Sequence, residues 1–583
     1  TIGNLTLGNG SITDSSGAIS FGNENLTTTG TVNTNNLKVT SDLNAKNASF
    51  TNDVDIAQNL NVLGNTQVSG NININSGNQY KINSSQFNYT YRNRIHFPYS
   101  ISLLVSYVKT KENLSSKFKF EKTFVFRDES KLDEYVEQCK DSDILLCSCY
   151  VWNWEITTYL AKKVKEINPQ CLIIFGGPQA PDIPDGFFEK YPFVDILVHG
   201  EGEIILENLL TEYLGNKDYS KIKGISTKEF TTDREVRIND FETLPSPYLT
   251  NTVWDLVNET EGIQWIVSWE TNRGCPYACT FCDWGSAIAT KVRKWSEDRL
   301  YKEIEWFADN KMRYIDCCDA NFGIFEERDR RIAEKLKEQA LEKKYPKKFG
   351  VAWAKNTTEK ILPIAKELRD GGIVGGISLS VQSLDPTTLK NIKRANIKFE
   401  KFSDLTTAFR QNNIPTYTEV IVGLPGETLA SFKDGLETIA QTKVGTFLWN
   451  ICSVLPNAPM NVPEYKEKFE IKTKTSPIKL RHASLEYIKK DRIREEEEIV
   501  TETSTFTKAD YVDSRKLHFV TQIFSNSGYF AIPYQIIKGM ISKELASFVY
   551  QYYPNGKKII EDDFLNEVLE NLRMSQTKSE NVN

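Results

Sequence analysis

Between residues 264 and 454 the chain alternates short apolar runs with longer stretches of helical periodicity, and this rhythm constrains the fold more than any other feature. Such alternation is typical of repeated strand–helix units around a parallel sheet, so it predicts an α/β domain whose functional groups lie in the loops after the strands. The strands are predicted at Gln264–Glu270, Met312–Cys317, Phe349–Ala354, Ile373–Val381, Thr416–Val422 and Phe447–Val454. The helices are predicted at Glu297–Asn310, Glu326–Glu342, Thr358–Asp370, Phe399–Asn412 and Leu429–Gln441.

Three cysteines lie close together just after the first of these strands. Cys275, Cys279 and Cys282 have the spacing Cys-x3-Cys-x2-Cys, Phe281 precedes the third, and the next cysteine is Cys317. Soft thiolates suit zinc or an iron–sulfur cluster. Ordinary cubane clusters take four cysteines, so three would leave one iron open to a small molecule. The alternative is a structural zinc site completed by a histidine, but none of the four histidines is close in sequence.

The cysteine spacing resembles the signature of the radical S-adenosylmethionine (SAM) superfamily, and the six strands resemble its partial (βα)6 barrel of the TIM type. The resemblance implies that Cys275, Cys279 and Cys282 hold a [4Fe-4S] cluster and that Phe281 lies beside adenine. It implies reductive cleavage of SAM to methionine and a 5′-deoxyadenosyl radical, which takes a hydrogen from a small-molecule substrate. An electron donor such as flavodoxin or ferredoxin is then expected.

Candidate SAM-binding side chains follow the second and fourth strands by the same resemblance. The second strand is followed by Asp319 and Asn321, where related enzymes usually carry a Gly-Gly-Glu-like stretch, and a helix cap is the alternative for both. Ser380 and Gln382 share one face of the fourth strand by alternation. Arg394 is a candidate partner for the methionine carboxylate, with solvent exposure as the alternative.

The fifth strand is followed by Gly423, Gly426 and Glu427, in a loop that resembles the one near adenine in this superfamily. Glycines there allow close approach of the backbone to a ligand. Glu427 has an alternative role as a charge at the N-terminus of the next helix.

A second strand–helix series, in residues 98–225, predicts a Rossmann-like doubly wound sheet. Its apolar runs lie at Ile101–Tyr107, Asp143–Cys149, Cys171–Phe175 and Val194–Val198. Ligands of such sheets sit at the carboxyl ends of the strands, where this chain has Ser148, Gly176, Gly177 and Gly200.

These loops resemble the cobalamin-binding domain that precedes many radical SAM domains, which implies cobalamin as a further cofactor and methyl transfer as the reaction. The Asp-x-His-x-x-Gly motif is absent, so no histidine is expected below the cobalt. The alternative is a retained domain that binds no cobalamin.

Residues 1–85 differ in composition, with seven charged residues before position 81 and a dominance of Asn, Thr, Ser and Gly. Aliphatic residues recur in units such as Asn35–Thr40 and Gly70–Asn75, which predicts short strands beside Gly/Asn turns that need stacking or neighbouring chains to form a core. The segment resembles the fibre repeats of phage tail proteins, which implies a homotrimer through these residues and association with a virion. A disordered polar leader is the alternative.

The remaining domains are a connector at 226–258, the barrel at 259–460 and a C-terminal region at 461–583 that is expected to be mainly helical and to cap the barrel. The net charge of −6 is well mixed, which argues against nucleic acid or a membrane as partner. Cysteines in apolar runs suggest a reducing cytoplasm. The chain begins with Thr1, which is typical of a fragment or processed product. The competing functions are a fibre protein with a degenerate radical SAM head and a zinc-binding module.

Overall fold

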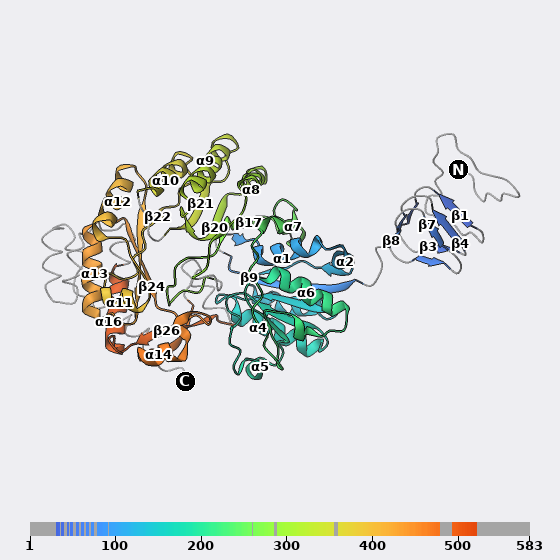
Figure 1. The fold of residues 1–583 in the computed structure, drawn as a ribbon, viewed down its shortest axis with the longest axis horizontal. Coiled ribbons are helices and arrows are strands. Elements are labelled where there is room, and N and C mark those ends of the chain that lie inside the picture. The colour runs from blue at the N-terminus through green and yellow to red at the C-terminus, as the bar shows by residue number, and fades with distance from the viewer. Residues whose placement is uncertain are drawn as a thin grey trace. The chain divides into compact units, whose positions relative to one another are not determined.

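The computed structural model describes residues 79–521, except 91–92, 259, 285–288, 355–358, 443 and 479–492, together with eight short strands between residues 31 and 74. The chain divides into two compact units. One comprises Thr1–Tyr80 with Glu112–Lys119, and the other Lys81–Lys111 with Phe120–Asn583. Figure 1 shows the elements of both.

The N-terminal strands form three parallel ladders within one chain, ordered β1-β4-β7, β2-β5-β8 and β3-β6. In one ladder Leu37 is opposite Val54, and Val54 is opposite Ile72, so successive repeats stack in register. The predicted short strands are confirmed, and the chain's own repeats supply their pairing partners. The strands are β1 (Thr31–Thr34), β2 (Leu37–Val39), β3 (Leu43–Ala45), β4 (Asn47–Phe50), β5 (Val54–Ile56), β6 (Leu60–Val62), β7 (Thr66–Val68) and β8 (Ile72–Ile74).

The Rossmann-like sheet has the order β9-β13-β14-β15-β16, with β12 also beside β9. Its strands are parallel except for β16 at the edge. The strands are β9 (Tyr80–Asn88), β12 (Phe124–Phe126), β13 (Ile144–Ser148), β14 (Leu172–Gly176), β15 (Ile196–Val198) and β16 (Ile225–Ser226). The other elements of this region are α1 (Tyr99–Lys109), α2 (Glu112–Ser115), β11 (Phe118–Phe120), η1 (Glu129–Lys131), α3 (Leu132–Gln138), α4 (Trp154–Ile167), α5 (Phe187–Lys190), α6 (Gly202–Leu214) and η2 (Tyr219–Lys221).

The start of this domain differs from the sequence-based expectation. Ile101–Tyr107 lies in helix α1, because a short apolar run fits a buried helix as well as a strand. The first strand is β9, whose polar residues Asn83, Ser84 and Ser85 are buried. The domain therefore begins near residue 80, not at 98.

The barrel follows the predicted order of strands and helices. Its strands are β17 (Gln264–Trp269), β20 (Tyr314–Phe322), β21 (Lys348–Trp353), β22 (Ile377–Ser378), β23 (Thr416–Val422) and β24 (Thr446–Ile451). Its helices are α8 (Glu297–Asp309), α9 (Glu326–Glu342), α10 (Ile361–Asp370), α11 (Pro386–Asn391), α12 (Phe399–Gln411) and α13 (Leu429–Gln441). The connector before the barrel contains η3 (Phe241–Thr243) and α7 (Thr252–Asp255).

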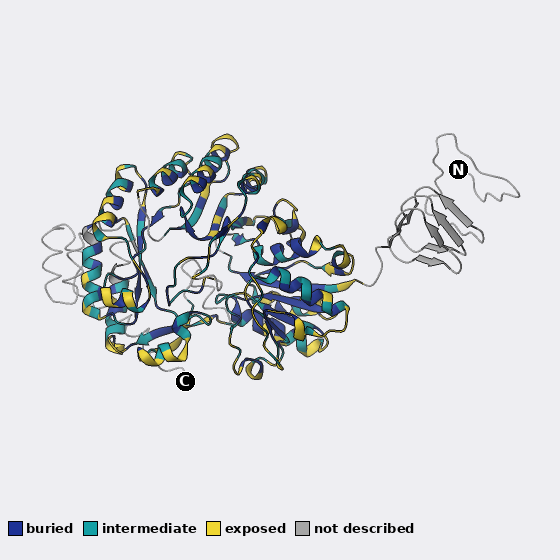
Figure 2. Ribbon diagram, in the orientation of Figure 1, coloured by how far each residue is buried: buried dark blue, intermediate teal, exposed yellow. Residues whose placement is uncertain are grey.

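The barrel strands form two parallel sheets, β10-β17-β20-β21 and β22-β23-β24, joined by a bridge between Phe349 and Val374. The strand β10 (Arg94–His96) was not predicted and adds an edge from a segment far back in the chain. The helices α8, α9, α10, α12 and α13 lie outside the strands (Figure 1). Buried residues follow the strands and exposed ones the outer helix faces, which places the core between them (Figure 2).

Residues 461–521 differ from the mainly helical prediction, and residues 522–583 lie outside the described part. The strands β25 (Lys472–Pro477) and β26 (Glu496–Glu502) form an antiparallel hairpin. β26 also lies beside the chain after β24, since Val454 N donates to Glu498 O and Val500 N to Cys452 O, both at 2.8 Å. The other elements are η4 (Pro459–Asn461), α14 (Pro463–Lys468) and α16 (Lys508–Thr521).

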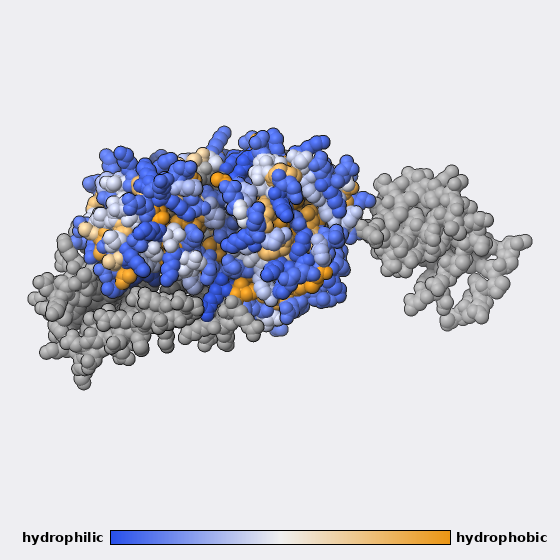
Figure 3. Space-filling model, turned by 90° about the horizontal axis from the view of Figure 1, so that it is seen from below, coloured by the Kyte–Doolittle hydropathy of each residue, from blue (hydrophilic) through white to orange (hydrophobic). Residues whose placement is uncertain are grey.

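The face of the molecule seen in Figure 3 is mostly hydrophilic, with hydrophobic residues in small groups. Among the described helices, none combines the length and the apolar character needed to cross a membrane.

Candidate functional site

The loop of the three cysteines leaves and re-enters the barrel through a short ladder. β18 (Asn272–Arg273) pairs antiparallel with β19 (Arg293–Lys294) at its base. Gly274 has a φ of 117°, and a Cβ there would lie 2.7 Å from Lys291 O, so the turn into the loop requires glycine. Cys275 and Cys279 are buried, and Cys282 is partly exposed.

The predicted residues Asp319 and Asn321 both lie within β20, which is longer than predicted, so neither caps a helix. Asn321 is buried, and its Nδ2 donates to Cys275 Sγ at 3.3 Å. Both oxygens of Asp319 are already occupied. They accept from Thr271 N at 2.8 Å, Asn272 Nδ2 at 2.6 Å and Thr271 Oγ1. Asp319 therefore supports the start of the cysteine loop, and its role as a direct ligand of SAM is not favoured.

Predicted site residues also come from the chain around the fourth strand, β22, and from the segment after α11, where Arg394 lies beside Cys279. Arg394 is buried rather than exposed, and its Nη2 donates to Ser380 O. Burial lowers the pKa of Arg394, while the neighbouring Cys279 opposes that shift. Ser380 Oγ donates to Glu419 Oε2 at 2.7 Å. Gln382 has a φ of 63° and is buried. A hydrogen bond thus joins Ser380 to Arg394, and Arg394 lies beside Cys279 of the loop.

The loop after β23 is shaped mainly by packing. Gly426 has a φ of 95°, which residues with a side chain rarely adopt, and a Cβ there would press against Asn391 Nδ2 of the protein itself. Gly423 has a φ of 87°, and a Cβ there would lie 3.6 Å from the nearest atoms, which belong to Val500. Glu427 is buried and accepts from Ser383 Oγ at 2.5 Å, so it is not an exposed helix charge. Phe281 packs against the apolar group that contains Leu424.

At the carboxyl edge of the Rossmann-like sheet the predicted loops contact one another. Ser148 O and Phe87 O accept from Asn153 Nδ2 at 3.0 and 3.1 Å, which fixes the turn after β13. Gly176 O accepts from Cys149 N at 2.7 Å. Gly177 has a φ of 101°, and a Cβ there would lie 2.6 Å from Cys149 O. These glycines serve the close approach of two loops.

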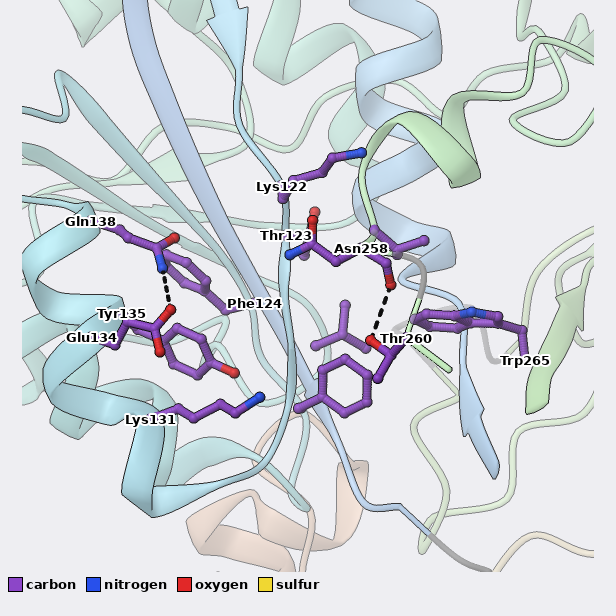
Figure 4. Close-up of a pocket in the computed structure, with 13 residues that line it drawn as sticks. Lys122, Thr123, Phe124, Lys131, Glu134, Tyr135, Gln138, Asn258, Thr260 and Trp265 are labelled. Atoms are coloured by element: carbon purple, nitrogen blue, oxygen red, sulfur yellow. Dashed lines mark hydrogen bonds between the residues drawn. The ribbon is translucent and has the colours of Figure 1, made fainter. Parts of the chain in front are cut away.

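A cavity of about 320 Å³ joins this edge to the barrel. It is lined by His199, Gly200 and Glu201 after β15, by Asp283 beside Cys282, and by Asn457 after β24. The structure therefore brings Gly200 and the cysteine loop to one cavity. A smaller cavity of about 100 Å³ lies away from the cysteines, with Phe124, Tyr135 and Trp265 in its wall (Figure 4).

The residues around the cysteines fit a cluster that binds a polar ligand. Asn321 Oδ1, Gln382 Oε1 and Arg394 Nη1 are buried without a hydrogen-bond partner in the described part of the chain. Buried polar atoms normally have partners, so these three are suited to a bound group. Within the described residues no three His, Cys, Asp or Glu side chains are placed to hold a single metal ion. A four-iron cluster binds each thiolate through a different iron, so it needs a wider spacing.

Comparison with known proteins identifies the barrel. Residues 269–439 match the family described as the Radical SAM superfamily. This part of the chain is similar to radical SAM domains. The match begins in β17, before the three cysteines, and ends in α13, so it covers the cysteine loop and most of the partial barrel.

The match to whole proteins extends beyond this domain. The chain is 35% identical over 445 residues to the cobalamin-dependent radical SAM methyltransferase TokK of Streptomyces tokunonensis. It is 34% identical over 446 residues to the 2-(S-pantetheinyl)-carbapenam-3-carboxylate methyltransferase of Streptantibioticus cattleyicolor. Each match covers 74% of this chain and 64% of the relative, which is less than two thirds of the relative's length.

The fold agrees with a solved structure of the radical SAM methyltransferase TsrM from Kitasatospora setae. The TM-score is 0.52 at 16% sequence identity, over 68% of this chain and 79% of that one. At this identity the likeness concerns the fold alone.

Charged residues at the base of the cysteine loop were not predicted from the sequence. Arg273 and Arg293 form ion pairs with Glu201 and Glu203 of the Rossmann-like domain. The Gly-Glu-Gly-Glu sequence after β15 predicts only a ligand-binding loop. The ion pair between Arg273 and Glu203 joins residues 70 positions apart, so no local sequence pattern reveals it.

Proposed function

We propose that this protein is a cobalamin-dependent radical SAM methyltransferase acting on a small molecule. The observation that carries the proposal is the cysteine triad with Asn321 Nδ2 at 3.3 Å from Cys275 Sγ and Arg394 beside Cys279. The two methyltransferase relatives support it. When bound, a [4Fe-4S] cluster with SAM supplies a 5′-deoxyadenosyl radical, and cobalamin supplies a methyl group.

The chain's own residues would bind and orient these groups. Cys275, Cys279 and Cys282 would hold the cluster, and Asn321 would donate to one of its sulfur ligands. The buried Arg394 has a free Nη1 among the described residues, which suits the SAM carboxylate. Gln382 Oε1 is a buried acceptor, which suits a ligand hydroxyl or amine. Burial of these groups excludes water, and orientation and electrostatics are the protein's contribution in such enzymes.

Cobalamin would bind at the carboxyl edge of the Rossmann-like sheet, near Ser148, Gly176, Gly177 and Gly200. His199 is the histidine at this edge, but both of its ring nitrogens already face protein groups. Nε2 lies 2.7 Å from Ser226 Oγ, and Nδ1 lies 3.5 Å from Asp182 Oδ1. Cobalamin should therefore be bound without a histidine below the cobalt.

The experiment is anaerobic reconstitution of the full chain with iron, sulfide and cobalamin, followed by a SAM-cleavage assay. We expect a brown protein that releases 5′-deoxyadenosine with a reductant and retains cobalamin. The absorption of that cobalamin should be unchanged in His199→Ala. Loss of all cobalamin on desalting would reject the methyltransferase assignment and leave a radical SAM enzyme without cobalamin.

We infer a substrate of the kind that the relatives' names describe, a small molecule with a carboxylate and amide groups, because one relative acts on a pantetheinyl carbapenam carboxylate. A flavodoxin or ferredoxin would deliver the electron. Cleavage assays with either protein in place of a chemical reductant test this, and a rate no higher than without reductant would exclude that donor.

For residues 1–85 we propose a role in joining copies of the chain, with three copies expected from the resemblance to fibre repeats. The support is the set of short parallel ladders, since strands of three or four residues bury little by themselves. We also propose that these residues attach the protein to a virion. The alternative of a fibre protein with an inactive radical SAM domain is not supported, because the relatives of this chain are named as enzymes.

A further inference from the structure

Two arginines close the base of the cysteine loop. Arg273 in β18 is directly opposite Arg293 in β19, so both ends of the loop carry a guanidinium at the same level. Their charged groups lie 5.3 and 5.2 Å from the centre of the Phe241 ring. Arg273 is two residues before Cys275. The backbone at Arg273 therefore helps to set the position of the first cysteine.

Two glutamates of the Rossmann-like domain bind these arginines. Glu203, in the first turn of α6, accepts from Arg273 Nη1 at 3.0 Å. Glu201, just before α6, accepts from Arg293 Nη1 at 3.1 Å, forms a second bond to Arg293 Nη2, and lies 3.7 Å from Arg273 Nη1. Ile238 N donates to the same Glu201 at 2.8 Å. Glu201 directly follows Gly200, and Glu203 lies two residues beyond Glu201, at the carboxyl edge of the sheet.

Arg273, Arg293 and Glu201 each form more than one contact with an opposite charge. Arg273 also forms a two-pronged pair with Glu270 at 2.9 and 2.9 Å, so three carboxylates face two guanidinium groups. The exposed fractions of the side chains are 14% for Arg273, 8% for Arg293, 11% for Glu201 and 4% for Glu203. Glu203 Oε2 has no hydrogen-bond partner among the described residues. Separating such buried charges is costly, because each would be left uncompensated.

We propose that Glu201, Glu203, Arg273 and Arg293 act as positioning residues that couple the two loops, so that a corrinoid at the sheet edge and the cluster at the cysteine loop bind cooperatively. This rests on the proposed function. The loop after β15 lines the cavity that also contains Asp283, next to Cys282, so a ligand there would order the glutamates. The glutamates would in turn fix the loop base in the position that the cysteines need.

Such coupling is reciprocal, so the cluster must strengthen cobalamin binding by the factor by which cobalamin strengthens cluster binding. The measurement is the Kd of hydroxocobalamin for the full chain, once with the cluster reconstituted and once after removal of iron by a chelator. We expect the cluster-loaded protein to bind at least about fivefold more tightly, since couplings between sites typically span about 5- to 150-fold.

The test variant is Glu203→Gln, which keeps the shape of the side chain and removes the charge that faces Arg273. We expect its ratio of the two Kd values to fall close to one, with the Kd of the iron-free protein nearly unchanged. The matched control is Glu207→Gln on the same helix, where the carboxylate binds Tyr107 Oη at 2.7 Å and Lys111 Nζ at 3.1 Å. Its ratio should equal that of the unchanged protein.

A ratio of one in the unchanged protein, or an unaltered ratio in Glu203→Gln, would overturn the inference while both cofactors still bind. An equal fall in Glu207→Gln would also overturn it, because the effect would then belong to the helix in general. If Glu203→Gln does not fold, Glu201→Gln replaces it with the same expected ratio. Absence of either cofactor from the unchanged protein would overturn the proposed function itself, and this coupling with it.

Discussion

At the scale of single residues, each buried cysteine of the loop lies beside a donor from another part of the barrel. Asn321 of β20 donates to Cys275 Sγ at 3.3 Å, and the guanidinium of Arg394 adjoins Cys279. Donors to thiolate ligands stabilise their negative charge and orient them. The resemblance to the radical SAM superfamily predicted Asn321 and Arg394 as site residues, but the sequence could not show which cysteine each would contact.

Replacing Asn321 with Ala should weaken the cluster. Outer partners of metal ligands typically contribute about 10- to 100-fold in metal affinity or activity, and Asn321→Ala removes one. Iron content per chain and the rate of 5′-deoxyadenosine release are the measurements. Asn310→Ala is the matched control, because Asn310 Nδ2 donates to Trp306 O at the end of α8. Full iron content and full rate in Asn321→Ala would refute a role for this hydrogen bond.

Glu427 should make the stability of the iron-free protein depend on pH. Burial raises its pKa to about 8, although Ser383 lowers it. The folded state therefore binds more protons than the unfolded state between about pH 4.5 and pH 8, so this group lowers stability as the pH rises through that window. Glu427→Gln should flatten the fall in melting temperature between pH 5 and pH 8. Parallel curves for the two proteins would contradict this.

At the scale of elements, β26 connects the barrel to the Rossmann-like domain. Glu495, just before β26, accepts from Glu155 N at 2.7 Å and Ile156 N at 3.2 Å at the start of α4. It also lies 3.4 Å from Arg127 Nε. Because α4 follows the turn held by Asn153, this one carboxylate supports the loop at which we expect cobalamin.

Removal of the Glu495 carboxylate should destabilise the protein. Glu495→Ala leaves Arg127 and the helix N–H groups without this acceptor, and breaking a buried ion pair typically costs about 3–5 kcal/mol. Denaturant unfolding is the measurement, with Glu496→Ala as control because Glu496 is the next residue along the chain and is exposed. A loss no greater than that of the control would show that the contact contributes little.

The same elements show how far the sequence predicts the fold. β23 and α9 have the predicted bounds because their apolar residues follow one period throughout. The strand predicted at Ile101–Tyr107 was wrong because a short, largely apolar run suits either element, and β26 was missed because Glu496–Glu498 resemble a charged helix. β10 was missed because a strand of three residues has no periodicity, and its partner β17 lies 170 residues further along the chain.

At the scale of the whole molecule, the two described units can be tested separately. Deletion of residues 1–79 removes the parallel ladders and leaves β9 and the barrel strands intact. We expect the shortened protein to keep the SAM-cleavage rate within about twofold, because none of the proposed site residues is removed. Native mass spectrometry should show a fall from three copies to one. A monomeric full-length protein would refute the trimer and leave the proposed activity untouched.

The central claim is that Cys275, Cys279 and Cys282 hold a cluster that cleaves SAM. The most direct measurement compares iron content and 5′-deoxyadenosine release in the anaerobically reconstituted full chain and in Cys279→Ala. The unchanged protein should hold about four irons and cleave SAM with a reductant, since one cubane contains four irons. Cys279→Ala should lose both, while Cys452→Ala, a buried cysteine outside the loop, should keep both. Full cleavage of SAM by Cys279→Ala would contradict the account.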